Sequence, residues 1–347
     1  MNDPVLSVLF ITYNHEKYLR QSLESVLSQE TDFDFEVVVG EDCSTDSTRD
    51  ILREYKKAYP DKVRLLFRDR NFGRPTLNVY ETAMECRGKY IATLEGDDYW
   101  IDTHKLQKAV DFLEAHPDYS GCANPALLIG EDGTELSDKT PLRLYTWDKE
   151  VYTLTDYRAD DIWPGQTASI VTRNFWKDGL YDYTVIYRAH DFIDDAWILL
   201  FTLLHGPIHH FDEVMSSWRY VVKDEGENWN SLNQRRNQYM QETYFHVAQM
   251  YWLEQYRGLD KRERERAWYD FKLGTSIFVK HPSAESWRVF ATVLKYDFLH
   301  VICCFPKPAM NEHTGEWKPS YVPRVLNDIS ESLAPDAAYP YSKAGNV

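Results

Sequence analysis

The first third of the chain alternates short apolar runs with amphipathic segments, and this alternation restricts the fold more than any other feature. Four apolar runs are typical of strands, and the first two have the continuous apolar pattern of buried strands. They cover residues 5–12, 35–39, 63–67 and 90–94. The segments between them carry apolar residues at helical spacing. The sequence therefore predicts an α/β fold with a mostly parallel, Rossmann-like sheet flanked by helices.

The rest of the chain has weaker local signals. Asn14 precedes the first helical pattern and is predicted to cap that helix. Beyond Gly121 the pattern changes, and a continuously apolar stretch near residues 192–204 predicts a buried helix. Asp132-Gly133 predicts a turn after the apolar residues 127–129, and further strands are expected at residues 166–172, 208–211 and 215–221, the last two as a closing pair.

The composition limits the partners and the compartment. A formal net charge of −16 over 347 residues argues against binding to nucleic acid. Five cysteines without a C-x-x-C pair indicate neither a disulfide framework nor a zinc site. The start of the chain has no secretory signal, and no run of about 18 apolar residues could span a membrane. We therefore expect a cytoplasmic protein, and peripheral contact with the inner face of a membrane stays open.

Polar clusters follow three of the predicted strands. Glu-Gly-Asp-Asp at residues 95–98, Thr-Tyr-Asn at residues 12–14 and Glu-Asp at residues 41–42 each end an apolar run. In a parallel sheet such strand ends share one edge, where ligands bind. Carboxylates this dense repel one another unless a cation compensates them, and magnesium-type ions are held by carboxylates together with substrate phosphates. The clusters indicate a divalent metal and a diphosphate, and a solvated acidic turn is the alternative.

Six motifs follow one another in a fixed order through this region. They are an apolar strand ending in T-Y-N at 8–14, S-V-L-x-Q at 25–29, a D-D-x-S-x-D variant at 41–46, N-x-G at 71–73, G-x-Y-I at 88–91 and G-D-D at 96–98. Thinner matches are Ile-Asp-Asp-Ala at 193–196 and Asp-Glu-Val-Met at 212–215, with Arg219 shortly after. Together these motifs resemble those of family-2 glycosyltransferases, inverting nucleotide-sugar enzymes with a GT-A fold.

The resemblance implies which residues bind the donor substrate. Asp98 is expected to hold a divalent ion, Mn²⁺ or Mg²⁺, with Asp97 on the metal or the ribose and Glu95 in support. Asp42 corresponds to the acid that accepts a hydrogen bond from the nucleotide base, and a helix cap is its alternative role. The other residues expected at the nucleotide are Thr12, Tyr13, Asn14, Asn71 and Arg74, of which the last two are equally well explained as turn residues.

The resemblance also implies the residues on the acceptor side. Inversion requires a base across the sugar from the departing nucleotide. Asp195 is expected in this role and Asp194 is its rival, while an acid favoured by a helix dipole is the structural alternative. Gln166 lies where the acceptor side of the family begins.

The implied activity is that of a metal-dependent inverting glycosyltransferase. It would move one sugar from a nucleotide-sugar to a glycan, lipid-linked or surface-polysaccharide precursor, and a UDP-sugar is the expected donor. The Q-x-x-R-W element of processive synthases is absent from the chain, which favours single-sugar addition. Val221 stands where the family often has a histidine, and this departure motivates the alternative of a non-catalytic nucleotide-sugar binding or assembly protein. A sugar-1-phosphate nucleotidyltransferase is a third, weaker alternative. Such enzymes have a glycine-rich, basic opening loop, which residues 12–16 of this chain do not resemble.

The resemblance also suggests the domain organisation. A GT-A catalytic domain is expected at residues 1–222, with a nucleotide-binding half at 1–120 and an acceptor-side half at 121–222. Residues 223–347 are expected to form a mostly helical extension with an irregular tail. In that extension an apolar stripe from Trp287 to Val301 has helical spacing. Packing onto the catalytic domain explains it most simply, a membrane-surface or partner-binding helix is the alternative, and a homo-oligomer is compatible with both.

Overall fold

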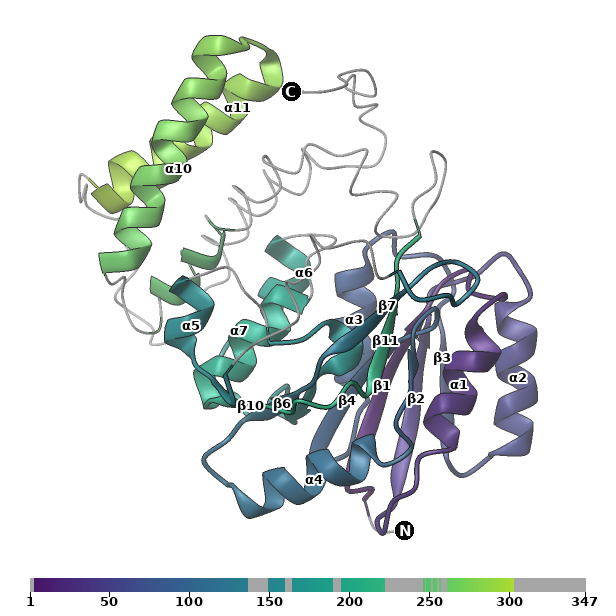
Figure 1. The fold of residues 1–347 in the computed structure, drawn as a ribbon. Helices are drawn as coiled ribbons and strands as arrows, with labels where there is room; N and C mark the ends of the chain where they lie inside the picture. The colour runs from purple at the N-terminus through teal and green to yellow at the C-terminus, as the bar shows by residue number, and fades with distance from the viewer. Residues whose placement is uncertain are drawn as a thin grey trace. The chain divides into compact units, whose positions relative to one another are not determined.

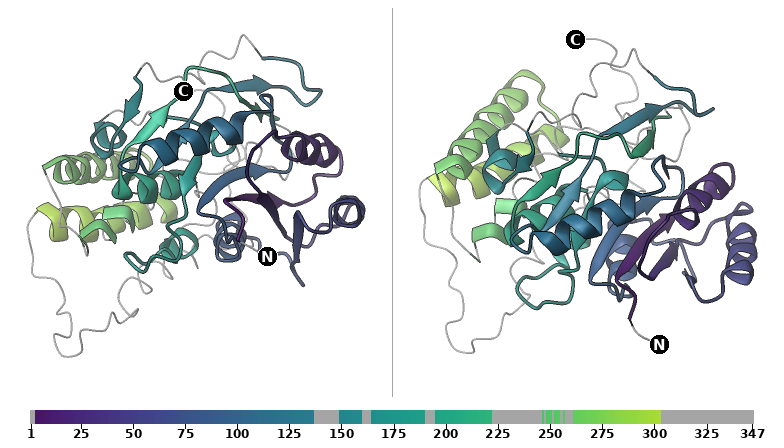
Figure 2. Two further views of the ribbon diagram at one scale, coloured as in Figure 1. Left: turned by 90° about the horizontal axis from the view of Figure 1, so that it is seen from below. Right: turned by 60° about the horizontal axis from the view of Figure 1, so that its bottom comes forward.

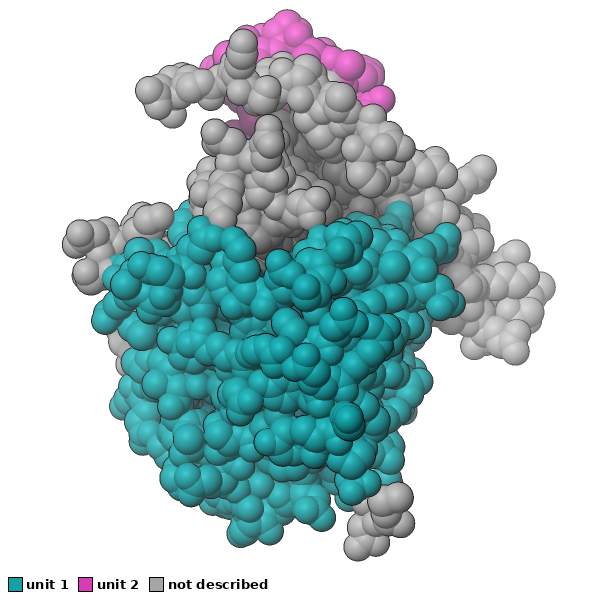
Figure 3. Space-filling view, turned by 90° about the vertical axis from the view of Figure 1, so that its right-hand side faces the viewer, with its two compact units in different colours: residues 1–183, 192–221 teal, residues 184–191, 222–347 magenta. Residues whose placement is uncertain are grey.

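The structure is a computed structural model of residues 1–347 that separates into two compact units. Unit 1 contains residues 1–183 and 192–221, and unit 2 contains residues 184–191 and 222–347 (Figure 3). The residues that the structure describes are 3–136, 149–159, 164–189, 195–221, 246, 248–250, 252–254, 256 and 261–302. All strands among these residues belong to unit 1.

Unit 1 is built on an eight-stranded sheet (Figure 1). The strands lie in the order β3 (Val63–Phe67), β2 (Phe35–Glu41), β1 (Leu6–Thr12), β4 (Tyr90–Glu95), β9 (Val171–Arg173), β6 (Gly121–Ala123), β10 (Ile208–His210) and β8 (Val151–Tyr152). The first four are mutually parallel, β9 is antiparallel to both of its neighbours, and β10 is parallel to β6. The predicted α/β fold with a mostly parallel sheet is confirmed.

A second, three-stranded sheet corrects one expectation. It has the order β5 (Tyr99–Trp100), β11 (Ser216–Arg219) and β7 (Ala126–Ile129). The expected pairing of residues 208–211 with 215–221 is wrong, because β10 pairs with β6 and β8 while β11 leaves the large sheet and pairs with β5 and β7. Two short strands that are close in sequence suggest a hairpin, but proximity alone does not determine their partners. The result is that β11 lies beside the strand that directly follows the acidic residues.

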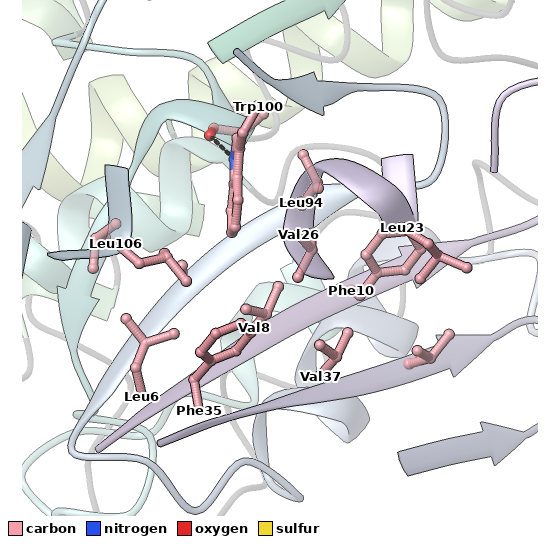
Figure 4. Packing of buried hydrophobic residues seen from close by; sticks show 14 of the residues in the cluster. Leu6, Val8, Phe10, Leu23, Val26, Phe35, Val37, Leu94, Trp100 and Leu106 are labelled. Carbon is pink, nitrogen blue, oxygen red and sulfur yellow. Dashed lines mark hydrogen bonds between the residues drawn. The ribbon is translucent and has the colours of Figure 1, made fainter. Parts of the chain in front are cut away.

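Helices cover both faces of the large sheet. α1 (Leu19–Leu27), α2 (Thr48–Ala58) and α4 (Lys105–Ala115) pack on one face, where Leu6, Val8 and Phe10 of β1 meet their apolar side chains (Figures 1, 2 and 4). α3 (Pro75–Ala83) contacts β1 and β2 from the other face, and the side-chain amide of Asn78 donates to the Gly40 carbonyl at 2.9 Å. Every residue of β1 and β2 is buried, as their continuous apolar runs predicted.

The start of α1 differs from the expectation. The helix begins at Leu19 without a side-chain cap, so the predicted capping role of Asn14 is wrong. Asn14 instead has a φ of 53°, and its side-chain oxygen accepts a hydrogen bond from the Thr45 N–H at 2.8 Å. Its backbone N–H donates to the Ser44 hydroxyl at 2.9 Å. The long-range bonds compete with local capping, and they tie the loop after β1 to the loop after β2.

The apolar helix predicted near residues 192–204 is α7 (Asp195–His205), which is buried from Ala196 to Leu203. The chain turns at Gly206, whose φ is 156°, directly into β10. α7 therefore runs opposite to β10, and its first residue lies toward the carboxyl edge of the sheet. The short helices are α5 (Leu154–Ala159) in unit 1 and α6 (Val185–Ala189) in unit 2.

The described part of unit 2 is helical, which confirms the predicted helical extension. Its long elements are α10 (Lys261–Lys280), α11 (Ala284–Val293) and the π-helix η3 (Leu294–Ile302). The ring of Phe271 stacks on Phe298 with centroids 4.4 Å apart, and Phe278 stacks on Phe290 at 5.3 Å. The apolar stripe thus packs against α10, and the expected irregular tail lies outside the described residues. Among the described helices, none has the length and hydrophobicity that crossing a membrane requires.

Candidate active site

The polar clusters identified in the sequence meet at the carboxyl edge of the large sheet. Glu95, the last residue of β4, is in register with Ile11 of β1. The next residue, Thr12, is in register with Glu41 at the end of β2. The Asp42 N–H then donates to the Thr12 carbonyl at 3.1 Å, which extends this pairing beyond the strands. The parallel register of three neighbouring strands thus brings distant segments to one edge, as predicted.

Glu95, Asp97 and Asp98 form an acidic turn in which one oxygen from each carboxylate lies within 4.8 Å of the others. Glu95 and Asp97 are half-buried, whereas Asp98 is 1% exposed. Burial, and second to it the charge of Asp97, raises the pKa of Asp98 well above its ordinary value. Three carboxylate oxygens at this spacing fit a divalent cation, which prefers oxygen ligands and would compensate their repulsion.

Asp98 is the innermost acid of the turn and is held by two N–H donors. Its Oδ1 accepts from the backbone N–H of Arg219 at 2.7 Å, and its Oδ2 accepts from the side-chain amide of Gln166 at 3.1 Å. The other end of the Gln166 amide accepts from the Ala168 N–H at 2.7 Å and opens a 3-10 turn, Thr167–Ser169. The strand predicted over residues 166–172 is therefore wrong in its first half. Gln166 lies against the acidic turn and supports Asp98.

Arg219 is the main anchor of the acidic turn. It is 3% exposed, and its Nε donates to the Asp97 carbonyl at 2.9 Å. One terminal nitrogen donates to the carbonyls of Gly130 and Glu131, both at 2.9 Å, and the other donates to the Gln21 side chain at 3.1 Å. A guanidinium offers five donors in a rigid plane, so Arg219 can join two other segments of unit 1, residues 130–131 and α1, to the turn. The match of residues 212–215 to the family pattern drew attention to Arg219 but gave it no role.

His15 lies over the middle of the acidic turn. Its Nδ1 is 3.3 Å from the Thr12 hydroxyl, and its Nε2 is 3.9 Å from a carboxylate oxygen of Asp97. A Cβ added at Gly96 would come within 2.7 Å of Nδ1 and 2.6 Å of the Thr12 hydroxyl, so the glycine leaves room for the ring. The side chains of His15 and Asp97 are each 20% exposed. His15 directly follows the T-Y-N motif, and this position is the only sequence signal that pointed to it.

Asp42, the candidate base-binding acid, is 6% exposed in the loop after β2. One of its oxygens accepts from the Phe72 N–H at 2.9 Å. Burial raises the pKa of Asp42 to about 6, although the Phe72 bond and the charge of Arg68 act in the opposite direction. The preceding acid, Glu41, is paired with Arg49. A carboxylate with one engaged oxygen can still accept a hydrogen bond from a ligand, so Asp42 is suited to recognise an N–H group.

Binding of a nucleotide base through Asp42 should depend on pH. The ionised carboxylate is the better acceptor, so affinity should rise as the pH increases through about 6, where the group loses its proton. We expect calorimetric titration with uridine, which has no phosphate to titrate, to show an affinity gain of about tenfold between roughly pH 5 and pH 7. The variant Asp42→Asn should lack this gain. A pH-independent affinity of the unaltered chain would contradict the role of Asp42.

The other residues predicted to bind nucleotide lie in the loops after β1 and β3. Tyr13 is half-buried, and the side chain of Asn14 is bound to the loop after β2. Asn71 is exposed and accepts a hydrogen bond from the Gly73 N–H, which is typical of a turn residue. Arg74 directly precedes α3. A contact of these residues with a nucleotide stays a prediction.

The two candidates for the base lie at the start of α7. Asp194 is outside the described residues. Asp195 is the first residue of the helix, is half-buried, and accepts a hydrogen bond from the Ala196 N–H at 2.7 Å. Its position is compatible with a helix-terminal acid and with a base near the carboxyl edge of the sheet.

Comparison with known proteins identifies relatives for the first half of the chain. Residues 7–175 match the family model described as Glycosyl transferase family 2. An uncharacterized protein of Mycobacterium bovis is 34% identical over 190 residues, which is 55% of this chain and 49% of the relative. The putative teichuronic acid biosynthesis glycosyltransferase TuaG of Bacillus subtilis is 32% identical over 137 residues, 38% of this chain and 51% of the relative. The chain spans about half the length of the curated relatives it matches.

Solved structures agree with this match at the level of the fold. The crystal structure of Staphylococcus aureus TarS 1–349 in complex with UDP-GlcNAc is similar with a TM-score of 0.58, over 85% of this chain and 81% of the TarS chain. The sequences are 19% identical, so the likeness concerns the fold. Residues 7–175 therefore resemble family 2 glycosyltransferases in sequence, and the chain has a fold similar to that of TarS.

Proposed function

We propose that the chain is a metal-dependent, inverting glycosyltransferase that moves one sugar from a UDP-sugar to a glycan, lipid-linked or surface-polysaccharide precursor. The observation that carries this proposal is the acidic turn, which lies at the carboxyl edge of the sheet near the buried Asp42. The family 2 match supports glycosyl transfer. TarS, which shares the fold, has been crystallised with UDP-GlcNAc and with UDP, and this supports a uridine nucleotide.

The uridine would bind at the loop after β2. Asp42 would accept the hydrogen bond of the ring N–H, and Tyr13 could stack on the base. β1 lies between β2 and β4 at this edge. Its Thr12 is in register with Glu41 of β2, and its Ile11 is in register with Glu95 of β4. The uracil and the diphosphate belong to one UDP molecule, so Asp42 and the acidic turn could bind the two parts of the same ligand.

Asp97 and Glu95 would hold the divalent ion, Mn²⁺ or Mg²⁺, because their carboxylates are half-buried and reach solvent. When bound, the ion supplies positive charge that neutralises the charge developing on the leaving diphosphate. Asp98, the ligand that the sequence favoured, can contribute the third oxygen. Both of its oxygens accept hydrogen bonds from the protein, so we propose that it mainly fixes the position of the turn.

Asp195, with Asp194 as its rival, would take the proton from the attacking acceptor hydroxyl. Attack opposite to the diphosphate inverts the anomeric carbon, so the base must lie across the sugar from the acidic turn. Transfer of a single sugar agrees with the absence of the processive Q-x-x-R-W element from the sequence.

A direct assay tests this proposal. The full chain should release UDP from at least one UDP-sugar in a panel of donors and glycan acceptors, and the release should stop when EDTA removes the metal. NMR of the product should show an inverted anomeric centre. Failure to bind or turn over any nucleotide-sugar would contradict the proposal as a whole, whereas a retained configuration would contradict only the inverting mechanism.

The second candidate is a non-catalytic nucleotide-sugar binding or assembly protein. Val221, in place of a histidine that the family often carries, is the observation that favours it. Such a protein would show a rise in melting temperature with UDP, because a ligand that binds only the native state stabilises it. It would release no UDP from any donor in the same panel, which separates the two candidates.

A further inference from the structure

We propose that His15 is a diphosphate-binding residue that donates a ring N–H to an oxygen of the leaving diphosphate. The inference rests on the proposed function, because it assigns part of the ligand bound at the same acidic turn. Its basis is the place of the ring, which lies over Gly96 with Nε2 3.9 Å from the Asp97 carboxylate. His15 and Asp97 reach solvent to the same extent, so one ligand can meet both.

The backbone of His15 holds the ring in this place without help from the side chain. Its N–H donates to the Thr48 hydroxyl at 3.0 Å. Its carbonyl accepts from the N–H groups of Tyr18 and Leu19 at 3.0 and 2.9 Å. All of these bonds are made by main-chain atoms of His15, so replacing the ring leaves the loop anchored. The ring is therefore the part of this residue that is available to a ligand.

The surroundings of the ring select the tautomer that can donate. The negative charge of Asp97 near Nε2 favours a proton on that nitrogen, and the Thr12 hydroxyl can then donate to Nδ1 at 3.3 Å. Nε2 makes no hydrogen bond to the described part of the chain, since 3.9 Å to Asp97 exceeds hydrogen-bond length. The Nε2–H group of His15 therefore lies near a negative charge but has no hydrogen-bond acceptor among the described residues.

A diphosphate would supply that acceptor. Nε2 lies 3.9 Å from the Asp97 carboxylate and both side chains reach solvent, so a phosphate oxygen at the outer side of the turn can lie within hydrogen-bond reach of Nε2, with or without an ion. A preorganised N–H donor at a group that gains negative charge favours the transition state more than the ground state. His15 would therefore act beside the ion on the leaving group.

Nucleotide titrations of the full chain test this role. The variant H15F should lose about tenfold or more in affinity for UDP, the range expected for a hydrogen bond to a charged group, while its affinity for uridine stays unchanged. The loss should be present in EDTA as well as with Mg²⁺. H15Q keeps an N–H donor and should recover part of the affinity, and it serves as the second variant if H15F folds poorly.

His104 is a matched control, because its Nδ1 also lies near a threonine hydroxyl, at 3.2 Å, and its Nε2 is 3.5 Å from the Glu30 carboxylate. H104F should leave the affinity for UDP unchanged. Three results for H15F would overturn the inference: an unchanged affinity for UDP, an equal loss for UDP and uridine, or a loss that appears only with Mg²⁺, which would identify a metal ligand. Failure of the unaltered chain to bind UDP would instead contradict the proposed function.

Discussion

The variant Asp97→Asn should lose about a thousandfold in kcat/KM for sugar transfer while keeping its melting temperature. The carboxylate of Asp97 is half-buried and accepts no hydrogen bond from the described residues, so the fold does not depend on its charge. Losing a metal ligand removes several kcal/mol of charge stabilisation from the leaving group, and this corresponds to the expected loss in rate. Kinetics at increasing Mn²⁺ should also show weaker activation by the metal.

Asp98→Asn is the matched comparison, one residue away on the same turn. Its amide NH₂ would face the Gln166 amide, which is itself a donor, and the unmade bond should destabilise the fold by about 1–3 kcal/mol. Thermal unfolding should therefore separate the two variants, with a lower melting temperature for Asp98→Asn alone. Full activity of Asp97→Asn, or an equal loss of stability in both variants, would contradict the metal role of Asp97.

The sequence was sufficient to predict the fold of unit 1 because its signals are local and strong. The runs that became β1 and β2 are buried along their whole length, and this burial is what a continuous apolar pattern reports. The parallel order of the strands then determined that Thr12, Asp42 and Glu95 would share an edge. Predicting this convergence required no knowledge of side-chain contacts.

The supports of the acidic turn could not be predicted in the same way. Arg219 reaches Asp97 and Asp98 only because β11 leaves the large sheet and pairs with β5. That pairing joins residues far apart in the chain, and a local pattern does not encode it. The same missing information made the expected pairing of β10 with β11 wrong. The bond from Gln166 to Asp98 is also long-range, so a local pattern does not encode it either.

Asp195→Asn should lower kcat by about two to four orders of magnitude, the range that a positioned general base contributes. Asp195 begins α7, which runs opposite to β10 and therefore starts toward the carboxyl edge of the sheet. Its role would concern the acceptor hydroxyl alone, so the affinity for UDP should stay within about twofold of that of the unaltered chain. Steady-state transfer kinetics and calorimetric titration with UDP measure the two quantities separately.

Asp156→Asn controls for the structural role of an acid at a helix start, because Asp156 lies in the first turn of α5 and accepts bonds from the Thr153 N–H and hydroxyl at 2.9 and 2.6 Å. An acid in the first turn of a helix stabilises it by about 0.3–1 kcal/mol through the helix dipole, so neither variant should lose more than about 1 kcal/mol of stability. If Asp195 acts only through the Ala196 N–H that it binds, the two variants should behave alike and transfer should persist in both. A base requires a carboxylate that can take a proton, so loss of turnover in Asp195→Asn alone would distinguish catalysis from capping. If Asp194→Asn loses turnover and Asp195→Asn does not, Asp194 is the general base.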